Sequence, residues 1–213
     1  MSLSQRIILA LLKPLFKLFI SWEVRGVENV PLTGPLIVVA NHVHLLDPPL
    51  LAFSFPRWIN FMAKEELFHY PILRVIIRWS QAFSVRRQGT IKDKREILKQ
   101  AEAILTKGLV LGMFPEGRRS REAKLLYGKP GAAVIASRLG IPLLPVGIIG
   151  TGKIKGISWP WKRPRVIINI GQPLLLPSVN RSLTRSQIKL LAQSMMSKIA
   201  ILLPPENRGV YGD

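Results

Sequence analysis

The chain has 213 residues, 48% of them hydrophobic, and its 31 basic against 12 acidic side chains give a formal net charge of +19. This size and composition fit one domain with a sizeable core, and the charge indicates an anionic partner, either an anionic membrane or a nucleic acid. The sequence has no zinc-finger pattern or RNA-recognition signature, and its five tryptophans are not interleaved with basic residues, so nucleic-acid binding is kept only as an alternative.

The N-terminal stretch, residues 4–22, is mostly apolar and carries Arg6, Lys13 and Lys17 at spacings of seven and four, which align them as one basic stripe on a helix. A spanning helix would bury Lys13 near the bilayer centre at a cost of roughly 2.5–3.5 kcal/mol. We therefore expect residues 1–24 to form an amphipathic helix in the membrane interface, in preference to a spanning or core-docking helix. The protein is then peripheral or monotopic on the cytoplasmic face of the cell membrane, bound to anionic phospholipid.

The next informative segment is Asn41-His42-Val43-His44-Leu45-Leu46-Asp47. It follows an apolar run at residues 35–40 that predicts a buried strand, and it precedes a proline-led run from Pro48 that predicts a helix. A histidine at a strand's end is well placed for catalysis in an α/β sheet. Asp47 would accept a hydrogen bond from one nitrogen of His42 and leave the other to take a proton from a substrate hydroxyl.

Two other interpretations of this segment remain open. Asp47 could serve only as the N-cap of the helix that starts at Pro48. Alternatively, His42 and His44 could be metal ligands, but the chain has three histidines and no cysteine from which to complete such a site. We expect no metal.

Thr90-x-x-Asp93 predicts the start of a helix that Gly108 ends, and a buried strand is predicted over residues 109–114. The segment Phe114-Pro115-Glu116-Gly117-Arg118-Arg119-Ser120 follows. A glutamate held between proline and glycine at a strand's end, with arginines after it, indicates an anion pocket; a solvated basic turn is the alternative.

The rest of the chain continues the alternation of strands and helices. Further elements are predicted as a helix at 130–139, strands at 143–149 and 166–170, and a helix from Thr184 to about Leu203. The glycine-rich stretch 147–153 lacks the hydroxyl of a phosphate-binding P-loop at Ile154, and we interpret it as a flexible loop at a sheet edge. We expect an α/β fold with helices packed on a mainly parallel or mixed sheet, a single domain over residues 25–205, and a tail at 206–213, with disorder from Pro204.

Taken together, Asn41-His42-x4-Asp47 and Phe114-Pro115-Glu116-Gly117-x-Arg119-Ser120 resemble the lysophospholipid acyltransferase family, whose bacterial members include 1-acyl-sn-glycerol-3-phosphate acyltransferase. Three further blocks agree with it: residues 61–68, 85–87 and 141–146. The resemblance extends over residues 28–205.

The resemblance implies a mechanism without an acyl-enzyme. His42, oriented by Asp47, would deprotonate the free hydroxyl of a lysophospholipid, which attacks the thioester carbonyl of acyl-CoA or acyl carrier protein. The expected product is phosphatidate, made from 1-acylglycerol 3-phosphate in phospholipid biosynthesis. Glycerol 3-phosphate or another lysolipid is the alternative acceptor, and no cofactor is expected beyond the thioester co-substrate.

The resemblance also implies a set of substrate-binding residues: Lys64, Arg87, Glu116, Gly117, Arg118 and Arg119. The guanidinium groups of Arg87 and Arg119, with Lys64, would hold the acceptor's phosphate, because arginine donates two parallel hydrogen bonds to phosphate oxygens. Glu116 and Gly117 would shape the acceptor site. Arg118 stands where the family usually has threonine and adds a guanidinium beside Glu116.

Overall fold

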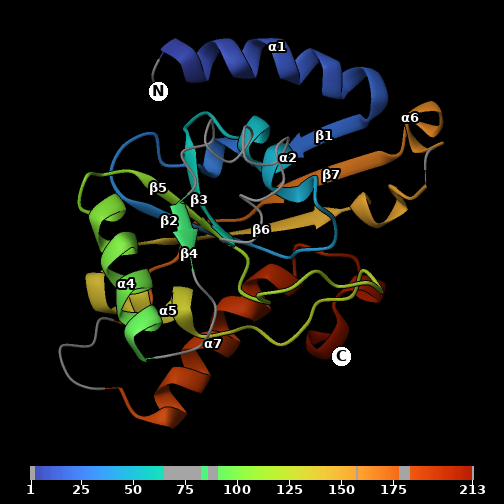
Figure 1. The fold of residues 1–213 in the computed structure, drawn as a ribbon. Helices are drawn as coiled ribbons and strands as arrows, with labels where there is room; N and C mark the ends of the chain where they lie inside the picture. The colour runs from blue at the N-terminus through green and yellow to red at the C-terminus, as the bar shows by residue number, and fades with distance from the viewer. Residues whose placement is uncertain (1–2, 65–82, 86–90, 157, 178–182, 213) are drawn as a thin grey trace.

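The structure, a computed structural model, describes residues 3–64, 83–85, 91–156, 158–177 and 183–212 (Figure 1). Its elements in chain order are α1 (Leu3–Phe19), β1 (Ser21–Arg25), η1 (Val27–Asn29), β2 (Leu36–Ala40), α2 (Asp47–Ser54), β3 (Ile59–Lys64), β4 (Phe83–Val85), α4 (Ile91–Leu105), β5 (Val110–Met113), α5 (Gly131–Leu139), β6 (Leu143–Ile149), η3 (Thr151–Lys153), α6 (Trp159–Lys162), β7 (Arg165–Ile170), α7 (Arg185–Ala200), η4 (Pro205–Asn207) and η5 (Gly209–Tyr211). Within these ranges no helix has the length and apolarity needed to cross a bilayer.

The strands of the described ranges form one seven-stranded sheet in the order β1-β7-β6-β2-β5-β3-β4. Neighbouring strands are parallel except for the antiparallel pair β6 and β7. The expectation of an α/β domain built on a mainly parallel or mixed sheet is confirmed. Val39 of β2 pairs with Met113 of β5, so the loops after these two strands start side by side at one edge of the sheet.

Helices cover both faces of the sheet, as Figure 1 shows. On one face α4, α5 and α7 pack against side chains that include Ile37 and Val39 of β2. On the other face α1 and α2 pack against Leu36, Val38 and Ala40 of the same strand. Because both faces are covered, β2 is an unbroken apolar run rather than an alternating one, which is why its position could be predicted from the sequence.

The predicted helix ends are confirmed where local chemistry sets them. Thr184 caps α7 with a capping box, in which its side chain accepts from the backbone N–H of Gln187 and the Gln187 side chain accepts from the backbone N–H of Thr184. Gly140 ends α5 with a left-handed φ of 62°. α7 stops at Ala200, a little short of the predicted Leu203.

The prediction for the N-terminal segment is wrong at its end. The helix finishes at Phe19, and Trp22 lies on β1, which pairs with β7. The sheet therefore begins inside residues 1–24, the stretch predicted to form the membrane helix. The apolar residues of β1 pack on the same core as Phe16, so the hydrophobic run continues across the boundary and conceals it.

Two further expectations are wrong. Of the stretch 147–153, residues 147–149 belong to β6, which has neighbours on both sides, and residues 151–153 form η3, so the stretch is not a flexible loop at a sheet edge. A Cβ at Gly147 would lie 2.8 Å from the carbonyl oxygen of Leu202, so the glycine allows a close approach of the chain. The segment after Pro204 is also ordered: it forms η4 and η5, and Leu125 donates its backbone N–H to the carbonyl of Asn207.

Candidate active site

His42 and Asp47 meet in the loop between β2 and α2. Nδ1 of His42 lies 2.8 Å from Oδ2 of Asp47. Because a carboxylate only accepts, the imidazole donates from Nδ1, and Nε2 is left as the nitrogen that can take a proton. The His42 side chain is 17% exposed whereas that of Asp47 is completely buried, so the imidazole is accessible from solvent but the carboxylate that orients it is not.

The Asp47 carboxylate also builds the turn that brings the pair together. Its Oδ2 accepts the backbone N–H groups of Val43 at 2.6 Å and His44 at 2.7 Å. The interpretation of Asp47 as only an N-cap is wrong, because Leu46 is the N-cap and Asp47 is the first residue of α2. The five-residue spacing in the sequence is therefore the length of a turn closed around one carboxylate oxygen.

The ring of His42 is held on its face as well. It stacks on Phe114 with ring centroids 4.3 Å apart and an angle of 26° between the planes. Phe114 directly follows β5 and stacks in turn on Phe61 of β3. A ring fixed both by Nδ1 and by its face has little freedom to turn, which suits a base that must act in one direction.

Glu116 ties the two loops of the site to each other. Oε1 accepts the backbone N–H of His42 at 2.7 Å, and Oε2 accepts the backbone N–H of Leu126 at 3.0 Å. Burial raises the pKa of Glu116 to about 7, against the opposing effect of these two hydrogen bonds, with the Asp47 charge adding to the rise and Arg118 opposing it. Both carboxylate oxygens accept hydrogen bonds from backbone N–H groups, so Glu116 holds the loops of the site together.

Gly117 lets the chain turn directly after Glu116. Its φ is +70°, and a Cβ would lie 2.9 Å from Nζ of Lys129, whose side chain crosses over the glycine. The backbone N–H of Lys129 donates to the carbonyl of Pro115 at 2.8 Å, and that of Ser120 donates to the carbonyl of His42 at 2.7 Å. Lys129 was missed by the sequence reasoning, because nothing near it in the sequence shows that the loop folds back onto the 114–120 segment.

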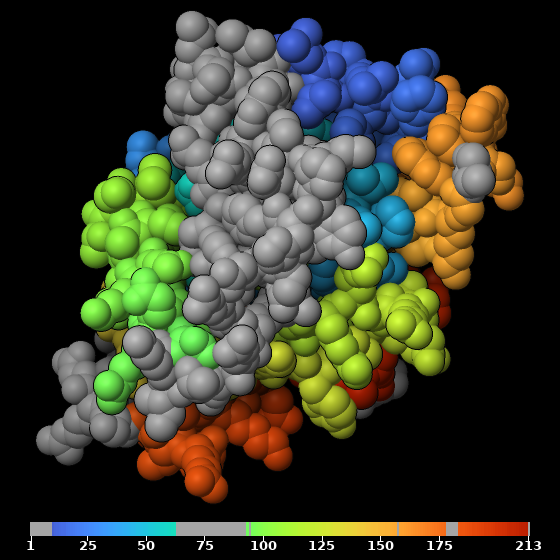
Figure 2. All heavy atoms as spheres, in the orientation of Figure 1, coloured from blue at the N-terminus to red at the C-terminus, as the bar shows by residue number. Residues whose placement is uncertain are grey.

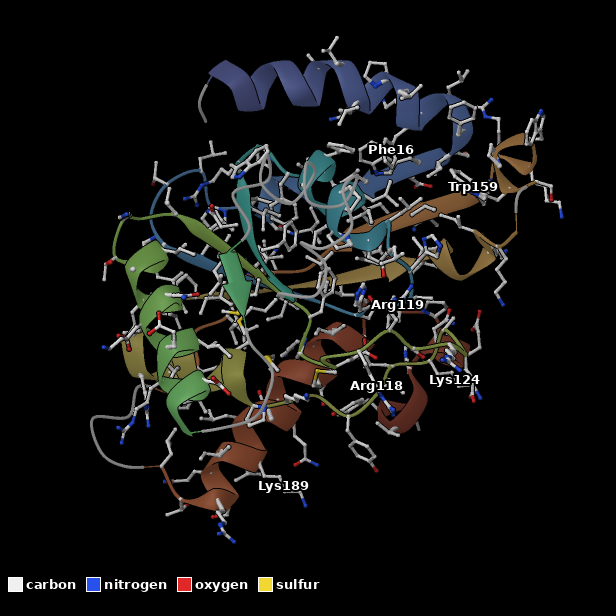
Figure 3. The ribbon with its side chains drawn as sticks, in the orientation of Figure 1. Phe16, Arg118, Arg119, Lys124, Trp159 and Lys189 are labelled. Atoms are coloured by element: carbon white, nitrogen blue, oxygen red, sulfur yellow. The ribbon has the colours of Figure 1, made fainter. Side chains whose placement is uncertain are left out.

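Arg118 and Arg119 are exposed on the loop after β5, and Figure 3 shows them with Lys124 further along the same loop. Their charges act on different groups of the site. The pKa of His44 is lowered chiefly by burial and further by the charge of Arg119, against the opposite effect of Asp47. Arg119 directly precedes Ser120, whose backbone N–H donates to the carbonyl of His42, so Arg119 is close to the His42 loop, whereas Arg118 acts on Glu116.

Two predicted site residues are not described to their side chains. Lys64 is the last residue of β3, and only its backbone is described. Arg87 lies outside the described residues. In the part of the chain that is described, no three or more histidine and acidic side chains gather in a group that could hold a metal ion.

Asn41 has a structural role that the sequence reasoning did not assign. Its buried amide donates to the carbonyl of Ile148 at 2.9 Å and accepts the backbone N–H of the same residue at 2.7 Å. This two-bond pairing extends the contact between β2 and β6 by one side chain and fixes the point from which the His42 loop departs. Its position directly before His42, after a buried strand, was the available signal.

Comparisons with known proteins agree on one family. A sequence model of the Acyltransferase family matches residues 21–149. The chain is 28% identical over 183 residues to the chloroplastic 1-acyl-sn-glycerol-3-phosphate acyltransferase BAT2 of Brassica napus, covering 85% of this chain and 51% of that protein. It is 27% identical over 128 residues to a 1-acyl-sn-glycerol-3-phosphate acyltransferase of Borreliella burgdorferi, covering 60% and 51%. The chain thus spans about half the length of these curated relatives.

A solved structure is similar over more of its length. The 1-acyl-sn-glycerophosphate acyltransferase PlsC of Thermotoga maritima matches with a TM-score of 0.66 and 30% identity, covering 89% of this chain and 75% of that one. This likeness extends beyond the residues of the family model to the C-terminal part of the chain.

The raised pKa of Glu116 predicts how the stability of the protein depends on pH. Its folded pKa of about 7 lies above the ordinary 4.5, so the folded protein binds this proton more tightly than the unfolded chain does. The unfolding free energy should therefore fall by about 3 kcal/mol as pH rises from 4.5 through 7. Glu116→Gln removes this slope, and urea titrations of both proteins across the range measure it.

Glu116→Gln should also be less stable at low pH than the wild type. A glutamine has one acceptor oxygen, so one of the two backbone N–H groups would face an amide NH2, at a cost of about 1–3 kcal/mol. Equal pH slopes in the two proteins would show that another group titrates here.

Proposed function

The chain belongs to the Acyltransferase family, and from this premise we propose that it transfers a fatty acyl chain from an acyl thioester to the free hydroxyl of 1-acylglycerol 3-phosphate, giving phosphatidate. The observation that carries the proposal is the 2.8 Å contact between His42 and Asp47, with Nε2 of the histidine left to act as base. The names of the Brassica napus, Borreliella burgdorferi and Thermotoga maritima proteins support this acceptor over glycerol 3-phosphate.

In the proposed reaction Nε2 of His42 takes the proton of the acceptor hydroxyl as its oxygen attacks the thioester carbonyl carbon. The new C–O bond gives a tetrahedral intermediate. Its collapse breaks the C–S bond, and the imidazolium returns the proton to the leaving thiolate. The Asp47 carboxylate stabilises the imidazolium between these steps, and the histidine ends in its starting state. The donor is acyl-CoA or acyl carrier protein, each of which leaves as a free thiol.

Arg118 and Arg119 lie where they can hold the acceptor's phosphate. Both are exposed on the loop that starts beside His42, and Arg119 is close enough to that loop to lower the pKa of His44. A guanidinium presents paired donors to phosphate oxygens, which would orient the glycerol hydroxyl toward the base. We assign this role first to Arg119, with Arg118 beside it and with Lys64 and Arg87 as the further members of the set.

The membrane contact is proposed at α1 and α6. Leu11, Leu15 and Leu18 of α1 point away from the domain, while Phe16 packs edge-on against Phe53 at a centroid distance of 5.1 Å. The helix is thus docked through one side and leaves an apolar stripe on the other, so docking and interfacial binding occur together. Burying such a stripe in the head-group boundary is favourable, and the +19 charge suits the anionic lipids of a cytoplasmic leaflet.

α6 extends this surface. Figure 2 shows it beside α1 at the same end of the molecule, and Nη2 of Arg163 donates to the carbonyl of Lys17 at 3.2 Å. Trp161 is 81% exposed next to the exposed Lys162 and Arg163. An exposed tryptophan beside basic side chains is typical of a protein surface that contacts the membrane interface.

His42→Ala should abolish acyl transfer, because it removes the imidazole that is proposed to take the hydroxyl proton. The measurement is thiol release from acyl-CoA, and separately from acyl carrier protein, by protein in detergent with and without lysophosphatidate. The chain has no cysteine and so contributes no thiol of its own. Vesicle binding should stay at its wild-type value, and a cooperative thermal transition serves as the control for folding.

Acceptor-dependent release that persists in His42→Ala would eliminate His42 as the base. If the wild type releases no thiol with either donor, but binds polyanions with a steep dependence on salt, a nucleic-acid-binding function gains support.

Arg119→Gln should raise KM for lysophosphatidate by about 10-fold or more, since a charged hydrogen bond to phosphate contributes on the order of 1.5–3 kcal/mol. KM for the donor should change little. Arg138→Gln is the matched control, because Arg138 is an exposed arginine in the last turn of α5 and its loss changes the net charge equally. An equal rise in KM for both substrates would contradict a phosphate contact.

Leu18→Ser should weaken binding to vesicles that contain anionic lipid by about tenfold, because burying a leucine contributes on the order of 1.5 kcal/mol. Leu190→Ser on α7 is the matched control: Leu190 is 64% exposed and Leu18 62%, but α7 lies at the other end of the molecule. Vesicle sedimentation measures both. Equal effects of the two substitutions would argue against α1 as the contact surface.

A further inference from the structure

The C-terminal residues are hydrogen-bonded to the loop that follows the 114–120 segment. The backbone N–H of Leu125 donates to the carbonyl of Asn207 at 2.8 Å, and the Asn207 side chain donates to the carbonyl of Ala123 at 2.8 Å. The Tyr211 hydroxyl accepts the backbone N–H of Gly128 at 3.2 Å. These contacts join two segments that are distant in the sequence, and they attach to the loop at three separate points.

The backbones of the C-terminal segment and of the loop approach each other closely. Gly209 has a left-handed φ of +56°, and its ideal Cβ would lie 2.2 Å from the carbonyl oxygen of Leu125. A side chain there would push the C-terminal segment off the loop, so glycine is required by both conformation and space. Leu125 itself is only 2% exposed and anchors the middle of the loop in the core.

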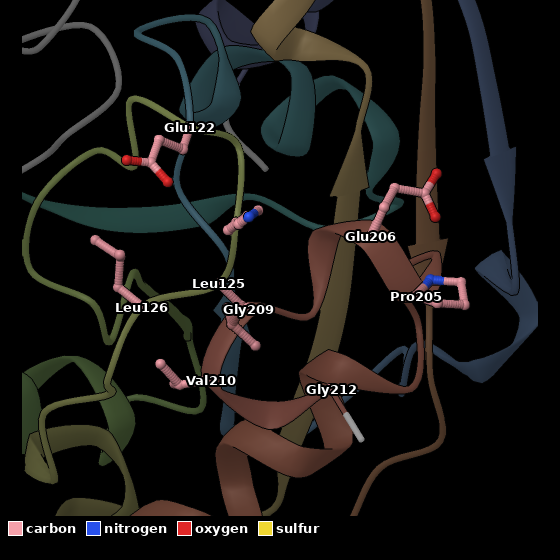
Figure 4. Close-up of a pocket in the computed structure, with 9 residues that line it drawn as sticks. Glu122, Leu125, Leu126, Pro205, Glu206, Gly209, Val210 and Gly212 are labelled. Carbon is pink, nitrogen blue, oxygen red and sulfur yellow. The ribbon is translucent and has the colours of Figure 1, made fainter.

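Hydrogen bonds hold the outer part of this loop where packing does not. A hollow of about 500 Å³ lies between the loop and the C-terminal segment. Leu126, Glu206 and Val210 are among the residues that line it (Figure 4). Leu126, on the rim of this hollow, is also the residue whose backbone N–H donates to Glu116. A loop with open space beside it can shift unless its backbone is tied.

We propose that the C-terminal segment, residues 204–211, positions the active site, with Asn207 and Tyr211 acting through the 123–128 loop and Glu116 on the backbone of His42. Each link in this path is a hydrogen bond: from Asn207 to the loop, from Leu126 to Glu116, and from His42 to Glu116. Asn207 and Tyr211 are positioning residues and contact no reacting atom. The kinetic consequence rests on the proposed acyltransferase function; the structural path does not.

The test uses the full chain in detergent with two substitutions. Asn207→Ala removes the amide that donates to Ala123, and Tyr211→Phe removes only the hydroxyl that accepts from Gly128 and keeps the ring, so it is the milder change. Asn29→Ala is the matched control: the Asn29 amide also donates to a backbone carbonyl from a half-buried position, at 3.0 Å from Ile170. It belongs to η1 and makes no contact with this path.

If the segment positions His42, Asn207→Ala should lower kcat by about tenfold, as expected for a small misplacement of a catalytic group, with KM for both substrates nearly unchanged. Tyr211→Phe should have a smaller effect in the same direction. Asn29→Ala should lose a similar amount of thermal stability but keep its kcat.

A second readout does not require activity. The chain has three histidines, so the ring carbon–proton NMR signals of the ¹³C-histidine-labelled protein can be assigned by substitution. The His42 signal should shift or broaden in Asn207→Ala and stay unchanged in Asn29→Ala. An unchanged His42 signal with unchanged kcat in both C-terminal variants, or an equal loss of kcat in Asn29→Ala, would overturn the proposal. A wild type without transferase activity would defeat the proposed function alone, because the NMR comparison would still decide the path.

Discussion

The Glu116 carboxylate is the interaction on which the geometry of this site depends. The loops after β2 and β5 leave neighbouring parallel strands at the same edge of the sheet, but strand pairing ends before either loop reaches its functional residues. Glu116 then connects them by accepting the backbone N–H of His42 with one oxygen and that of Leu126 with the other. Because a buried carboxylate without such donors would be strongly unfavourable, the two loops and the glutamate stabilise one arrangement together.

The two buried acids of the site have different tasks. Asp47 gathers three donors on one oxygen and sets both the turn and the imidazole tautomer, while Glu116 spreads its oxygens over two loops. Burial raises the pKa of Glu116, and the exposed Arg118 on the loop after β5 opposes this rise. Two of the few acidic residues of the chain are thus buried in the site, where they accept hydrogen bonds from backbone N–H groups and from the His42 imidazole. The basic residues of the described ranges remain on the surface.

The surface near α1 and α6 combines apolar and basic side chains. The apolar stripe of α1 and the exposed Trp161 of α6 lie together, and basic side chains flank both. A lysolipid acceptor has an apolar chain and an anionic head group, and the proposed membrane surface and arginine pair match these two parts. Away from this surface, the C-terminal segment is hydrogen-bonded to the loop that carries Leu126.

Much of this could be predicted from the sequence because the signals are local. The unbroken apolar run of β2, the capping box at Thr184 and the spacing of His42 and Asp47 each depend on neighbours along the chain, and the structure has the strand, the cap and the close pair. Other features could not be predicted. They are the boundary between α1 and β1, the hydrogen bonds by which Glu116 joins two loops, the crossing of Lys129 over Gly117, and the ordered structure of the C-terminal segment. Each depends on contacts between segments far apart in the sequence, such as Asn207 with Ala123, and only tertiary packing determines which distant donors and acceptors meet.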